Sequence, residues 1–99
     1  MEMICEVAGR QLRLRYTFNS ICAVEDMAGV GMDRLMDKAY SAVRLLFWGA
    51  LIDRQPEMTI KEAGEIIGQH IKGGGRLDDI AGMCAEALER AGFAMPEMG

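Results

Sequence analysis

The side chains of this chain that could do chemistry are few and widely spaced. There is one histidine, His70, in 99 residues, and the three cysteines lie at positions 5, 22 and 84. Hydrolytic or group-transfer chemistry needs a nucleophile, a base and an orienting group within reach of one another. His70 has no serine or cysteine at a spacing that indicates such a partner. It is better interpreted as a flank of an apolar helical stripe, and we predict that the protein is not an enzyme.

Patterns for metal binding and acid–base chemistry are also incomplete. Cys5, Cys22 and Cys84 form no CxxC pair, and with a single histidine they match no known zinc-ligand spacing. The acidic pairs at residues 25–26 and 78–79 are adjacent, so on a helix their side chains diverge. We expect no metal and no cofactor. The odd number of separated cysteines predicts buried thiols in a reducing compartment.

Two segments partly match nucleotide-binding or DNA-binding motifs. Three glycines between Lys72 and Arg76 precede a helix, as in a phosphate cradle, but no Gly-Lys-Ser/Thr follows them. Residues 58–68 are similar to the first half of a helix-turn-helix, yet the helix that follows is acidic rather than basic. A flexible joint is the preferred interpretation of the glycines. A small DNA-binding regulator that uses residues 59–90 is kept as an alternative.

Methionine is unusually frequent, with nine in the chain. Its flexible, polarisable side chain fits many apolar shapes, so it is common on adaptable binding surfaces. One group falls at a helix–loop–helix joint and another near the C-terminus. Core filling and an exposed patch explain these groups about equally well. The residues predicted to bind a partner are Met27, Met32, Met36, Phe93, Met95 and Met98.

Length and composition indicate one domain, residues 1–93, followed by a frayed tail at 94–99. The net charge is −4, and the acidic excess falls in residues 51–99, with five basic and nine acidic groups. Such a half repels phosphate backbones, so nucleic acid is not expected as a partner. The longest apolar stretch, residues 43–52, is half a membrane span, and the N-terminus lacks the basic residues of a signal peptide. These features predict a cytoplasmic protein with no membrane partner.

Residues 2–16 alternate between apolar and polar side chains, which predicts a β-hairpin that turns at Ala8-Gly9. The expected cross-strand pairs are Met3 with Leu14, Cys5 with Leu12, Glu2 with Arg15 and Glu6 with Gln11. A lone two-stranded hairpin is only marginally stable. It must pack on helices or pair its edges with another copy, and Arg13 and Arg15 are the residues predicted for self-association.

Helical periodicity covers residues 19–91. Thr17 or Asn19 can cap the first helix, Asp33 can cap the next, and that segment runs on or breaks near residues 40–41. Residues 43–52 are apolar on nearly every side, which is typical of a buried central helix. A Thr59–Glu62 capping box begins an amphipathic helix with apolar positions Ile60, Ala63, Gly64, Ile67 and Ile71.

The last predicted helix has its apolar face at Leu77, Ile80, Ala81, Cys84, Leu88 and Ala91. Gly92 in the left-handed conformation would end it, with Phe93 folding back onto Leu88. The predicted fold is mainly α, a bundle of four to five helices with an N-terminal two-stranded β-hairpin.

The order of these patterns along residues 3–93 resembles the tail assembly chaperones of long-tailed bacteriophages, specifically the small family shared with gene transfer agents. The matching features are the turn at Gly9, the run Leu12-x-Leu14-x-Tyr16-Thr-Phe18, Glu25, Gly29-Val-Gly31, the apolar helix Leu45–Leu51, Pro56 and the Thr59 cap.

The resemblance implies a non-enzymatic protein that binds and solubilises the tape measure protein, an apolar helical filament, while the tail tube assembles. It further implies a homo-oligomer in the host bacterial cytoplasm that is absent from the mature virion, with the tail tube protein as a further candidate partner. A structural virion component, such as a head–tail connector or tube-associated subunit, is the alternative. Weak contacts would suffice, because many copies on one filament act together.

Overall fold

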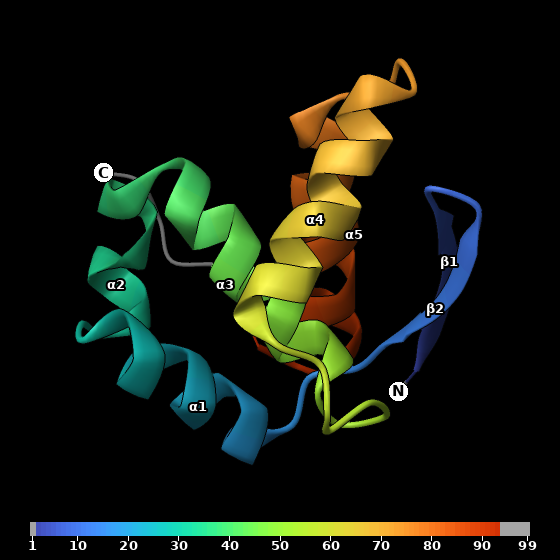
Figure 1. Ribbon diagram of the computed structural model, residues 1–99. Coiled ribbons are helices and arrows are strands. Elements are labelled where there is room, and N and C mark those ends of the chain that lie inside the picture. Colours follow the sequence, from blue (N-terminus) through green and yellow to red (C-terminus); the bar gives the residue numbers. More distant parts are fainter. Residues whose placement is uncertain (1, 94–99) are drawn as a thin grey trace.

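The computed structural model describes residues 2–93 of the chain (Figure 1). A hairpin packs beside five α-helices, which confirms the predicted mainly α fold with an N-terminal β-hairpin. The elements are β1 (Met3–Val7), β2 (Arg10–Leu14), α1 (Phe18–Ala28), α2 (Met32–Leu35), the 3₁₀ turn η1 (Met36–Lys38), α3 (Tyr40–Leu51), α4 (Ile60–Lys72) and α5 (Leu77–Arg90).

The hairpin turns at the two predicted residues. Ala8 and Gly9 both have positive φ, 52° and 76°, as the tightest two-residue hairpin turn requires. The strands pair in the expected register, with Met3 opposite Leu14 and Glu6 opposite Gln11. One face of the hairpin is buried against the helices, through Met3, Val7, Leu12 and Leu14.

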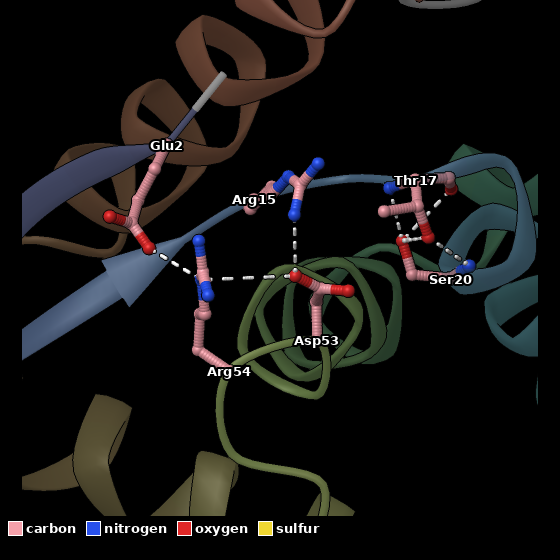
Figure 2. A network of polar contacts seen from close by, with 6 residues as sticks. All are labelled: Glu2, Arg15, Thr17, Ser20, Asp53 and Arg54. Atoms are coloured by element: carbon pink, nitrogen blue, oxygen red, sulfur yellow. Dashed lines mark hydrogen bonds and ion pairs between the residues drawn. The ribbon is translucent and has the colours of Figure 1, made fainter.

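Glu2 and Arg15 do not pair with each other, contrary to the sequence-based expectation. Arg15 instead lies 3.2 Å from Asp53, and Glu2 lies 2.6 Å from Arg54 (Figure 2). The backbone N–H of Arg15 also donates to the carbonyl of Ala50, at 2.8 Å. The base of the hairpin is therefore attached to the C-terminal end of α3, which lies next to it only in the folded chain.

Helix α1 begins at Thr17, whose hydroxyl accepts a hydrogen bond from the Ser20 N–H at 3.1 Å, while the Ser20 hydroxyl accepts one from the Thr17 N–H at 2.7 Å (Figure 2). This resolves the choice between Thr17 and Asn19. The predicted Asp33 cap of α2 is wrong. The cap position is Gly31, and the N–H of Met32 donates to the Glu25 carboxylate at 2.6 Å. A side chain from α1 thus satisfies the exposed amide of α2.

Helix α3 is the central element and contacts α1, α4, α5 and β2 (Figure 1). It begins at Tyr40, immediately after Ala39, which has a φ of 52°, so the segment breaks close to the predicted point. The prediction of a buried apolar helix is confirmed. Its buried residues are Ala42, Val43, Leu45, Leu46, Phe47, Gly49, Ala50 and Leu51.

Helices α4 and α5 pack against α3 and against each other. Thr59 caps α4 by accepting the Glu62 N–H at 3.0 Å, whereas the Glu62 carboxylate lies 3.8 Å from Arg10 of the hairpin instead of returning to the cap. After α5, Gly92 has a φ of 87° and the Phe93 N–H donates to the carbonyl of Leu88 at 2.9 Å. The predicted ending of the last helix is confirmed.

Candidate functional site

The predicted methionine surface lies on α1, α2 and η1. Met27 is 56% exposed at the end of α1. Met32 and Met36 are half-buried and pack against the core. Core filling therefore accounts for part of the group, while Met27 offers an apolar side chain to solvent.

The predicted C-terminal group is described only at its first residue. Phe93 is half-buried and packs against the core. Met95 and Met98 lie outside the described residues. Their predicted role in partner binding stays a prediction.

An open groove that the sequence analysis did not identify lies on the surface of the described residues. It has a volume of about 1140 Å³ and lies between the start of α3, one face of α4 and the start of α5. We call it the α3–α4–α5 groove. Its apolar lining comes from Tyr40, Ile60, Ile67, Ile71 and Leu77, and its polar and glycine lining from Ser41, Arg44, Lys61, Gly64, Glu65, Gly68, Arg76 and Asp78.

The groove exists because α4 has two apolar faces. Ala63 and Ile66 point into the core and are 0% and 1% exposed. Ile60 and Ile71 line the groove on an adjacent face, and Ile71 is 46% exposed. Ile67, between the two faces, is buried and also lines the groove. The single stripe expected from the sequence is thus divided between the core and an open surface.

Tyr40 forms part of the groove wall and is 79% exposed, an unusual position for a large aromatic side chain. It sits at the first position of α3, where the chain has just left the turn at Ala39. Apolar side chains scattered singly on a surface are ordinary, whereas a contiguous apolar hollow marks a binding site. A repeat of Ile60, Gly64, Ile67 and Ile71 offset from the core positions is the sequence signal that could have identified it.

His70 makes a structural contact. Its Nε2 lies 2.9 Å from the Asp79 carboxylate, which also accepts the backbone N–H of Arg76 at 2.9 Å. Both hydrogen bonds lower the pKa of Asp79 below its usual value, and the one from the Arg76 backbone has the larger effect. The pair joins the end of α4 to the first turn of α5 and thereby supports one end of the groove.

The three cysteines differ in their surroundings. Cys84 is buried, as expected, but Cys5 and Cys22 are only partly buried, so the prediction of buried thiols holds for one of the three. Burial raises the pKa of Cys84 to about 12, although a hydrogen bond with Tyr16 acts in the opposite direction. Tyr16 is buried too, and its hydroxyl donates to the carbonyl of Leu46 at 2.5 Å. A thiol in this environment is protonated at neutral pH and is not activated as a nucleophile.

Within residues 2–93, no three His, Cys, Asp or Glu side chains gather in a way that could hold a metal ion. None of the helices in this part of the chain is long and apolar enough to cross a membrane.

The two arginines predicted for self-association differ in availability. Arg15 is engaged within the chain through Asp53 and Ala50. Arg13 is exposed on the outer face of β2 and forms no ion pair among the described residues, and Glu6 and Ile4 are exposed on the outer face of β1.

Comparison of the chain with protein-family models, with curated proteins and with solved structures found no match.

Proposed function

We propose that this chain is a non-enzymatic tail assembly chaperone that binds and solubilises the tape measure protein during long-tailed phage tail assembly. The order of sequence patterns supports the family assignment. The observation that carries the binding role is the α3–α4–α5 groove, an open apolar hollow in a domain of 99 residues. Amphipathic helices bind in apolar grooves of this kind by burying their own apolar stripe.

The proposed mechanism is temporary coverage of apolar surface. A long helical filament exposes apolar stripes that would aggregate before the tail tube surrounds it. Each chaperone copy would cover a short stretch, and many weak contacts on one filament would act together. Tail tube subunits would then displace the copies by competition. The setting proposed is the host bacterial cytoplasm, with the chaperone absent from the mature virion.

We further propose that copies associate, since a filament-coating protein gains avidity from neighbours. The outer edges of the hairpin are the candidate contacts, because the described strands form a sheet of only two. Unpaired strand edges readily accept another strand. Of the predicted pair, Arg13 is the residue available for such a contact, while Arg15 is held by Asp53.

Co-expression with the tape measure protein encoded beside it tests the proposal. We expect the chaperone to co-purify with that protein and to increase its soluble fraction. Met27→Lys, at an exposed position of α1 outside the groove, should leave the free energy of unfolding within about 0.5 kcal/mol, so weaker co-purification of this variant would show that the predicted methionine surface also contacts the client. Failure both to co-purify and to increase solubility would contradict the proposal.

A structural virion component is separated from a chaperone by mass spectrometry of purified particles, in which a chaperone is missing and a connector or tube subunit is present. A DNA-binding role is disfavoured by charge. The exposed residues of α5 include Asp78, Asp79, Glu86 and Glu89, which repel phosphate.

A further inference from the structure

The α3–α4–α5 groove runs along most of the length of α4. The groove follows α4 from Ile60 to Ile71 and is closed by α3 on one side and by the start of α5 on the other. Helix α4 has 13 residues, which corresponds to a length of about 20 Å. A partner helix of three to four turns would fill this length and place its own apolar stripe on Ile60, Ile67 and Ile71.

Two glycines one turn apart, Gly64 and Gly68, lie in the groove. A β-carbon at Gly68 would meet no other atom within 4 Å, and one at Gly64 would meet only the aliphatic stem of Arg44, at 3.0 Å. Intramolecular packing therefore does not require glycine at position 68. Glycine there costs helix stability relative to alanine. Because Gly68 has no side chain, the backbone of another helix can approach α4 closely at this position.

The charged side chains around the groove indicate which charge a partner should carry. The chain carries a net charge of −4, but the groove is lined by three basic side chains and two acidic ones. Arg76 lies 3.7 Å from Asp78. Within residues 2–93, Arg44 and Lys61 form no ion pair. Glu65 also lines the groove and forms no ion pair among these residues, so Arg44, Lys61 and Glu65 leave a net charge of +1 beside the apolar floor. This local positive charge in a chain of net charge −4 favours an occupant with acidic side chains next to its apolar stripe.

We propose that the groove binds an α-helix of the client protein, laid along α4 with its closest approach at Gly68 and with acidic side chains directed to Arg44 and Lys61. This inference rests on the proposed function for the identity of the client, but the groove can be tested separately. The occupant is a helix with an apolar stripe and an acidic flank, not an extended peptide and not a second copy of the chain.

The first experiment uses two labelled 14-residue model helices with the same leucine and alanine stripe, one flanked by glutamate and the other by lysine. We expect the glutamate helix to bind the full chain about 10-fold more tightly at low salt. Arg44→Glu combined with Lys61→Glu should reverse the preference. Equal binding of the two helices, or no binding of either, would overturn the inference.

The second experiment places a side chain in the groove. Gly68→Leu should keep or raise the midpoint of urea unfolding, because position 68 has open space and leucine is the better helix former. It should weaken binding of the glutamate helix by about 10-fold or more, by analogy with overpacked contacts. The matched control is Gly82→Leu, since Gly82 on α5 is also exposed and equally free of neighbours but lies outside the groove. Unchanged binding by Gly68→Leu, or equal loss in both variants, would overturn the inference.

The two proposals fail in distinguishable ways. If the tape measure protein co-purifies equally well with Gly68→Leu, the chaperone function stands and the groove assignment is wrong. If the model helix binds in the groove but the tape measure protein does not co-purify, the groove assignment stands and the function is wrong. Self-association of the wild-type chain is measured by sedimentation. If Gly68→Leu abolishes this self-association and Gly82→Leu does not, a second copy occupies the groove and the inference is overturned.

Discussion

Gly49 on α3 lies so close to Val24 on α1 that a β-carbon at position 49 would overlap the Val24 methyl group Cγ2. The same β-carbon would lie 3.6 Å from the Tyr16 ring. The crossing of α1 and α3 therefore depends on the absence of a side chain at this one position. Val24 of α1 and several residues of α3 belong to the buried core. The distance between the two helices therefore determines how closely Val24 packs against α3.

We expect Gly49→Ala to lower the free energy of unfolding by about 1–3 kcal/mol, because overpacking at a tight helix contact outweighs the gain in helix propensity. Urea denaturation monitored by circular dichroism measures the change. Gly82→Ala is the control, since position 82 is open, and it should raise stability by about 0.5–1 kcal/mol. A stabilising Gly49→Ala would show that the helices are farther apart than described.

The second prediction concerns the pH dependence of the α4–α5 joint. The pKa of Asp79 is lowered in the folded protein by the hydrogen bonds from Arg76 and His70. A depressed folded pKa contributes stability that is present above the unfolded value, about 3.9, and is lost as the pH falls through the folded value. Asp79→Asn should therefore destabilise the protein at pH 7, and its difference from wild type should shrink below about pH 4.

Urea denaturation at pH 7, 5 and 3 measures this difference. Asp78→Asn is the control, because the Asp78 side chain is 85% exposed and lies 3.7 Å from Arg76. We expect it to change stability little at any of the three values. A deficit in Asp79→Asn that stays constant across this range would mean that the carboxylate charge is not what joins the two helices.

The third prediction concerns thiol reactivity. Since the pKa of Cys84 is raised to about 12, only about one thiol in 10⁴ is ionised at pH 8, and the side chain is also 1% exposed. Cys84 should remain unlabelled by a thiol-specific disulfide reagent in the folded protein and should react once urea unfolds the chain. Partly buried Cys5 and Cys22 should react earlier, Cys5 slowly because burial raises its pKa as well.

Three variants that each retain a single cysteine identify the residue that reacts. In these variants serine replaces Cys5 or Cys22. Cys84 is better replaced by alanine, because serine would place a hydroxyl in the core. Rapid labelling of Cys84 in the native state would show that the interior around Tyr16 opens far more easily than the described packing implies.

The fourth prediction concerns self-association through the hairpin. If the outer edge of β1 pairs with the outer edge of β2 in another copy, Glu6 and Arg13 come onto one face within reach of each other. Glu6→Arg and Arg13→Glu should then each reduce association in sedimentation velocity, and the double variant should restore it. If the wild-type chain and all three variants associate equally, the hairpin edges are not the contact.

Local structure was predictable where neighbouring residues alone decide it. The hairpin turn needs positive φ at two positions, and Ala8-Gly9 between two alternating runs supplies them. Thr59 at the start of α4 and Gly92 after α5 act on amides and carbonyls within one turn of themselves. In such cases both partners of the interaction are close together in the sequence.

Interactions between elements were not predictable in this way. Glu25 caps α2 across a loop, and Arg15 reaches Asp53, 38 residues later, in preference to the expected Glu2. Each choice depends on which side chains the folded backbone brings together. Sequence periodicity gives the face of a residue, but it does not give the partner across that face.

The candidate site shows the same division. The sequence by itself determined that α4 is amphipathic and that α3 is a buried central helix. Only the tertiary structure decided that Ala63 and Ile66 take the core side of α4, while half-buried Ile60 and exposed Ile71 line the groove with Tyr40. The reason is geometric: a helix has several faces, and which of them is covered depends on how α3 and α5 cross it, a relationship set by packing over the whole domain.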